Sequence, residues 1–73
     1  MNDPTTLDVR GLSCPEPAML VRRALGRLEH GRVTVLLDSE LSRDTVARLS
    51  ELSGWRVAVE EQPDGCFRLV LTR

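Results

Sequence analysis

The sequence predicts an α+β fold of two layers, in which two helices cover one face of a four-stranded sheet. Three observations lead to this prediction. The predicted elements follow the order β-α-β-α-β-β, both helical segments are apolar on one side only, and three strand segments alternate apolar and polar residues. The 73 residues suffice for one domain, residues 1–73, and a composition with 41% hydrophobic residues is that of a globular protein.

The first strand is predicted over residues 5–10, where apolar and polar residues alternate until Gly11. A helical period begins at Pro15, and Gly31 is the predicted end of this first helix. The apolar residues that recur at helical spacing are Leu20, Val21, Ala24, Leu25 and Leu28.

The second strand is predicted over residues 32–37, because the run RVTVLL is rich in residues that favour strands. The second helix begins with Ser39 or Ser42 as its N-cap and ends at Gly54. Its predicted apolar stripe consists of Val46, Leu49 and Leu52.

The last two strands, residues 55–62 and 67–72, form a predicted hairpin around the turn Pro63-Asp64-Gly65. Proline presets φ in such a turn and glycine supplies a positive φ. The two strand–helix–strand connections should be right-handed and should join parallel strands. The carboxyl ends of the first two strands then lie at one end of the sheet, where parallel sheets place ligand sites.

Chemistry is expected at the stretch GLSCPEP, residues 11–17. If Cys14 is the N-cap of the first helix, Pro15 and Pro17 occupy positions whose N–H groups have no partner inside a helix, so both are tolerated. The N–H of Glu16 then remains for the Cys14 side chain, and the positive helix end favours a thiolate. The carboxylate of Glu16 opposes this effect, so we expect a moderately activated thiol.

The sequence lacks the second group that most thiol enzymes need. No C-x-x-C motif accompanies Cys14, and the only histidine, His30, belongs to the far end of the predicted helix. A positioned thiol without a base suits a carrier whose partners supply the remaining chemistry. We therefore expect a relay protein more than a self-contained enzyme, and we predict no metal site and no cofactor.

The segment LDVRGLSCPEP, followed by a helix, resembles the signature of the TusA/SirA sulfur-carrier family with its CPxP motif. The resemblance implies a mixed sheet of strand order 1-2-4-3. It also implies that Cys14 receives sulfur as a persulfide from a cysteine desulfurase or another donor and passes it to an acceptor protein. Family members serve tRNA thiolation and other sulfur or selenium metabolism, and residues 36–61 resemble the selenium-linked YedF-like branch most.

Further site residues are expected around the thiol. Asp8 and Gly11 match the family pattern and should shape the turn, and Leu12 is a candidate apolar contact for partners. Asp38 ends the second strand at the same end of the sheet, where it either faces the sulfur site or supports the next helix. Basic residues of the first helix, which the resemblance assigns to partner docking and which otherwise form a solvated face, are Arg22, Arg23 and Arg27.

The totals restrict the function classes. A net charge of −1 and two aromatic residues argue against direct nucleic-acid binding. Residues 1–8 lack the pattern of a signal peptide, and the longest apolar run is too short to span a membrane. We therefore expect a cytoplasmic protein, with no membrane partner, and a monomer.

Two alternatives to the sulfur carrier stay open. The chain could be a non-catalytic regulatory or adaptor module, in which the surface matters and the thiol does not. It could also be a redox protein that pairs Cys14 with Cys66. The implied strand order counts against the second alternative, because two strand spacings exceed the separation that a disulfide allows.

Overall fold

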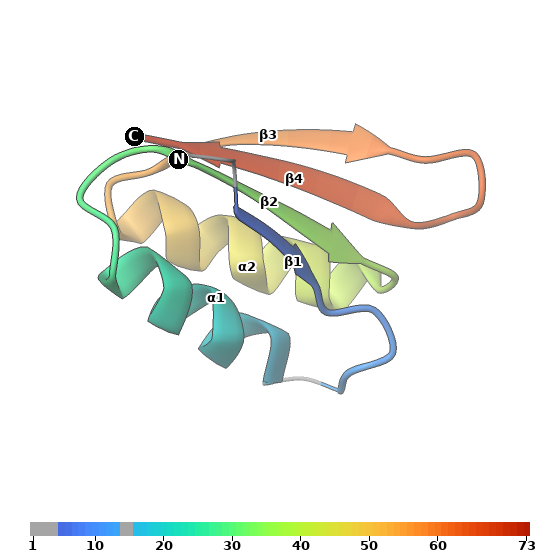
Figure 1. Ribbon diagram of the computed structural model, residues 1–73. Helices are drawn as coiled ribbons and strands as arrows, with labels where there is room; N and C mark the ends of the chain where they lie inside the picture. Colours follow the sequence, from blue (N-terminus) through green and yellow to red (C-terminus); the bar gives the residue numbers. More distant parts are fainter. Residues whose placement is uncertain (1–4, 14–15) are drawn as a thin grey trace.

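The structure is a computed structural model that describes residues 5–13 and 16–73 (Figure 1). Both helices lie on the same face of the sheet, as the sequence predicts. The elements in chain order are β1 (Thr5–Asp8), α1 (Glu16–Gly26), β2 (Arg32–Leu37), α2 (Glu40–Leu52), β3 (Arg56–Glu61) and β4 (Phe67–Thr72).

The sheet has the strand order β1-β2-β4-β3, which confirms the order that the family resemblance implies. β1 pairs with β2 in parallel, and β4 is antiparallel to both β2 and β3. β1, β2 and β3 therefore run in the same direction. We call the end of the sheet at which these three strands finish the motif end, and the opposite end the far end.

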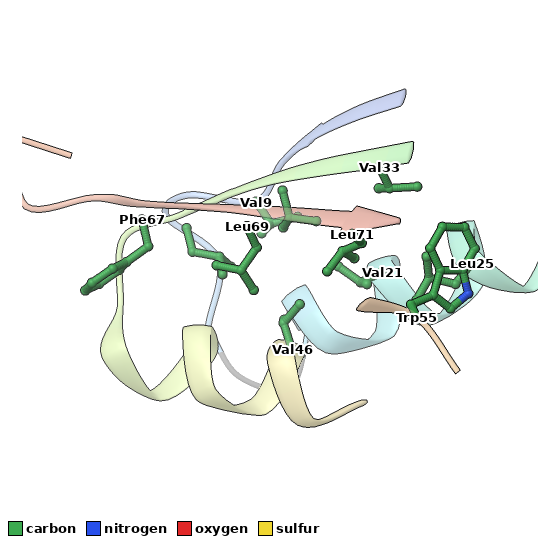
Figure 2. Packing of buried hydrophobic residues seen from close by; sticks show 11 residues of the cluster. Val9, Val21, Leu25, Val33, Val46, Trp55, Phe67, Leu69 and Leu71 are labelled. Atoms are coloured by element: carbon green, nitrogen blue, oxygen red, sulfur yellow. The ribbon is translucent and has the colours of Figure 1, made fainter. Parts of the chain in front are cut away.

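The core lies between the helices and the inner face of the sheet (Figure 2). Alternation in β2 and β4 turns every second side chain inward, so the inner residues are almost fully buried while their neighbours are not. Within the described ranges, eleven hydrophobic residues form this core: Val9, Val21, Leu25, Val33, Val35, Leu37, Val46, Trp55, Phe67, Leu69 and Leu71.

The first helix is shorter than predicted, because it ends at Gly26 and not at Gly31. The amide of Leu28 donates to the carbonyl of Leu25 at 3.1 Å, a tighter pattern that closes the last turn. Gly31 has a φ of +135° and exchanges two backbone hydrogen bonds of 3.1 Å with Arg73. Gly31 thus extends the pairing of the sheet and does not end a helix.

Helix α2 begins as predicted but packs differently. Ser39 is the N-cap, and its Oγ accepts from the amide of Ser42 at 3.4 Å. Leu52 is 80% exposed, so its assignment to the apolar stripe was wrong. The inner face continues from Val46 through the buried Ser42 and Ser50, four residues away on either side, and Ser50 Oγ donates to the Val46 carbonyl at 2.8 Å.

Candidate functional site

The motif end of the sheet holds the segments on either side of the predicted thiol. Cys14 and Pro15 themselves lie outside the described residues. β1 leads into residues 10–13, all of which are exposed, and α1 begins at Glu16. The described residues therefore define the frame of the site, from the end of β1 to the first turn of α1.

Asp38 and Gly11 connect two strands at this end. The Gly11 amide donates to Asp38 Oδ2 at 2.8 Å, across 27 positions of the sequence. Gly11 has a φ of +82°, which glycine adopts without strain. Ser39 is the residue that caps α2, and the carboxylate of Asp38 binds the segment that leads to the motif. Whether Asp38 also faces the sulfur site stays a prediction, because Cys14 lies outside the described residues.

Asp8 and Arg10 form a two-point ion pair beside this segment. Arg10 Nε donates to Asp8 Oδ1 at 2.8 Å, Arg10 Nη2 donates to Oδ2 at 2.7 Å, and the Arg10 amide also donates to Oδ1 at 3.2 Å. The side-chain and then the backbone hydrogen bonds from Arg10 lower the pKa of Asp8 to about 2. Asp8 thus binds Arg10 beside the turn, a partner that the sequence did not lead us to expect.

Arg10 also lies near a second thiol. Its bonds to Asp8 raise its pKa above the ordinary value, and the side chain of Cys66 contributes in the same direction. Asp8 and Arg10 are two residues apart, so they project to the same face of an extended segment. That spacing of opposite charges was the signal that could have identified Arg10 from the sequence.

The start of α1 corrects one detail of the predicted thiol site. The Glu16 amide donates to the carbonyl of Ser13 at 2.8 Å, so it is not left for the Cys14 side chain. Glu16 is exposed in the first turn, where its carboxylate meets the positive helix end. Pro17 is buried, so the second proline of the motif packs into the interior as well as fitting the start of the helix.

An apolar surface continues from the motif along α1. Met19 is 61% exposed and Leu20 is 40% exposed, so the prediction that Leu20 faces the core was wrong. Leu12 is also exposed, as expected for a partner contact. The shallow hollow at this place is lined by Leu12, Glu16, Met19, Leu20 and Arg23.

The three arginines that were predicted to dock partners are all exposed. They surround a second shallow depression further along α1, together with Met19 and Gly26. The surface that α1 presents is therefore mixed, with apolar side chains near the motif and positive charges beyond them. The arginines are Arg22, Arg23 and Arg27.

Cys66 comes directly before β4 at the motif end. It is half-buried and is a free thiol in the part of the chain that the structure describes. Its amide donates to Asp64 Oδ1 at 3.0 Å in the predicted turn, where Gly65 has a φ of +87°. β2 lies between β1 and β4, as the argument against a disulfide assumes.

Comparison with known proteins decides the family. The family model for the sulfurtransferase TusA matches residues 5–73. The chain belongs to the TusA family. It is 31% identical over 68 residues to a protein of Methanocaldococcus jannaschii that is named as a sulfur carrier, a match that covers 92% of this chain and 91% of the relative.

A solved structure agrees with this assignment. The crystal structure of a SirA-like protein from Desulfitobacterium hafniense superposes with a TM-score of 0.88 at 30% identity, covering 93% of this chain and 95% of that chain. The TusA/SirA resemblance and the α+β fold are thereby confirmed, and the chain is a TusA-like sulfur carrier in general terms. Within the described residues, no helix has the length and apolar character needed to cross a membrane.

Proposed function

We propose that Cys14 carries sulfur as a persulfide between a donor protein and an acceptor protein. The observation that carries this proposal is the CPxP motif of a TusA family member, set between an anchored turn and the start of α1. The reaction needs a thiolate, a stable position for the bound sulfur and access for two partners. Charge near a helix N-terminus is favourable for both the thiolate and the more acidic persulfide.

The transfer step requires no oxidant and no cofactor. The Cys14 thiolate attacks the outer sulfur of the donor's persulfide, a Cys–Sγ–S bond forms, and the donor's S–S bond breaks. The electron pair leaves with the donor thiolate. In the second step a nucleophile of the acceptor attacks the outer sulfur on Cys14, and the Cys14 thiolate is released.

The described residues supply position, not proton transfer. The Asp38–Gly11 hydrogen bond and the Asp8–Arg10 pair fix the segment that enters the motif. Glu16, at the first turn of α1, moderates thiolate formation because a nearby negative charge disfavours ionisation. An intermediate thiol pKa suits a relay, because the same sulfur atom must attack as a thiolate in the first step and leave as a thiolate in the second.

We further propose that α1 receives the partners. Exposed Leu12, Met19 and Leu20 offer apolar contact beside the motif, and the arginines of α1 offer charge contacts to an acidic surface. The donor would be a cysteine desulfurase or a similar cytoplasmic protein. The acceptor would serve tRNA thiolation or another sulfur or selenium pathway.

Intact mass spectrometry tests the carrier function. The chain is incubated with a cysteine desulfurase and cysteine, and it should gain the mass of one sulfur atom. Cys14→Ser should abolish this gain, and the matched variant Cys66→Ser should retain it. A gain that survives Cys14→Ser contradicts the proposal, and simultaneous loss of both thiols without a gain in mass supports the redox pair instead.

Charge reversal tests the docking surface. Arg23→Glu should slow loading by the desulfurase, mostly through slower association, and the effect should shrink at high salt. Arg32→Glu makes the same charge change on β2, away from α1, and should leave loading unchanged. Equal loading rates for both variants would contradict docking through α1.

A further inference from the structure

Strand β3 forms an open edge of the sheet. Its only neighbour among the described strands is β4, and Figure 1 shows it on the outside of the sheet. Val59 projects from the inner face, yet it is 47% exposed, and Val57 is only half-buried. Open edge strands offer unpaired backbone groups to another chain.

The hairpin determines which residues of β3 offer these groups. The Gln62 amide donates to the Cys66 carbonyl at 2.9 Å, so Gln62 directs its backbone groups towards β4. Successive residues of an antiparallel pair alternate in this direction. Ala58 therefore points its backbone groups at β4 as Gln62 does, and Val57 and Val59 point theirs outwards from the sheet.

The sequence of β3 is complementary to itself when read in the opposite direction. Its first five residues are Arg56-Val57-Ala58-Val59-Glu60. An antiparallel second copy centred on Ala58 places Arg56 opposite Glu60 of the second copy, twice by symmetry. On the inner face the same register places Val57 opposite Val59 of the second copy. Each opposed pair lies on one face of the combined sheet, as antiparallel pairing requires.

The hydrogen-bonding phase agrees with this register. The outward backbone groups of Val57 meet those of Val59 of the second copy, so these residues form hydrogen-bonded pairs. Arg56 and Glu60 then occupy the closer, non-hydrogen-bonded positions, in which side chains approach best. Glu60 Oε1 already lies 3.6 Å from Arg68 Nε of its own chain. Arg56 of the second copy would therefore extend an alternating row of positive and negative charges across the two sheets.

We propose that two copies of this chain associate through β3 in antiparallel orientation, centred on Ala58, and join their sheets into one. This departs from the monomer expected from the sequence, because the structure adds which backbone groups of the edge strand point outwards. A contact of one short strand buries little surface, so the dimer should be weak and concentration-dependent. The two motif ends then point in opposite directions, and sulfur transfer does not depend on the dimer.

Sedimentation velocity at rising concentration, up to about 1 mM, tests the association. The chain should shift from monomer towards dimer. Arg56→Glu and Glu60→Arg should each raise the dimer dissociation constant at least about tenfold, because each brings like charges together. An equimolar mixture of these two variants should dimerise again, because every opposed pair is then of opposite charge.

Glu29→Arg serves as the matched control, since it makes the same charge change as Glu60→Arg at an exposed loop position. It should dimerise like the unaltered chain, and circular dichroism should show that all variants are folded. A monomer at every concentration would overturn the proposal. So would single variants that dimerise like the unaltered chain, or a mixture that stays monomeric.

Discussion

The two ends of the sheet hold their connecting segments in different ways. At the motif end, residues 10–13 are all exposed, and a hydrogen bond of an exposed pair, from Gly11 to Asp38, connects them to the end of β2. At the far end, the segment that enters β3 buries Trp55 to 3% exposure and donates its amide to Ser50. The motif end therefore contributes position, and the far end contributes stability.

This division gives a rule for variants. Changes at the far end should lower the free energy of unfolding without a specific effect on sulfur transfer by the folded protein. Loss of an exposed polar contact at the motif end should instead slow sulfur transfer with little effect on the free energy of unfolding, because such contacts contribute little to stability. The following predictions test the rule, beginning with the largest expected effect.

Replacement of Trp55 should be the most destabilising change. Trp55→Ala should cost about 3–5 kcal/mol, a large share of what a domain of this size possesses. Trp55 Nε1 is buried without an acceptor in the described part of the chain, so Trp55→Phe removes an unpaired donor and should cost far less. Urea unfolding measures both, and equal losses for the two variants would contradict this account.

Glycine replacements at the two ends compare position with stability directly. Gly11 has a φ of +82°, and Gly54 has a φ of +92°. An added Cβ would meet nothing within 4 Å at Gly11 and one side-chain atom at 3.9 Å at Gly54, so neither position is crowded. Gly11→Ala and Gly54→Ala should each cost about 1–2 kcal/mol from backbone strain alone. Only Gly11→Ala should also slow persulfide loading of the folded protein, and equal loading rates would contradict the rule.

Loss of the Asp38 carboxylate should affect sulfur transfer more than folding. Asp38→Ala removes the acceptor of the Gly11 amide, an exposed bond, so the free energy of unfolding should fall by no more than about 1 kcal/mol. Loading and unloading of Cys14 should slow, because the segment that enters the motif is released. Glu40→Ala, in the first turn of α2, is the matched control and should load at the unaltered rate.

How far the sequence predicted the molecule also differs between the ends. Strand propensity located β2 residue by residue, and hydrophobic alternation did the same for β4, because burial on one face leaves a period of two. The end of α1 was misjudged, since Gly31 serves the sheet and the helix closes at Gly26 without a conspicuous signal. Periodicity says which side of a helix is apolar, but not how much of that side the sheet covers, and so Leu20 and Leu52 were misassigned.

The candidate site was predictable where it depends on local chemistry. The CPxP motif is visible in the sequence itself. The proximity of Asp38 to the segment that leads to this motif follows from the parallel pairing of β1 and β2. The hydrogen bond from the Glu16 amide to the Ser13 carbonyl could not be predicted in this way, because it depends on the conformation of the turn. Arg10 was missed, although opposite charges two residues apart were a signal in the sequence for its pair with Asp8.

The smallest expected effect is a pH dependence from Asp8. Its folded-state pKa of about 2 lies below the ordinary 3.8, so the pair with Arg10 stabilises the fold above about pH 4. That contribution is lost as the pH falls from about 4 to about 2. Because Asp8 and Arg10 are exposed, the effect should be small and should weaken with salt.

Comparison with Asp8→Asn isolates this effect. The difference in free energy of unfolding between the unaltered chain and the variant should be constant above pH 4 and should vanish towards pH 2, because the protonated carboxyl resembles the amide. NMR titration of the Asp8 carboxyl provides a second readout that global stability does not influence. A midpoint near 3.8 would show that the pair with Arg10 does not persist in solution, and the Asp38–Gly11 bond would then matter more for the position of the motif end.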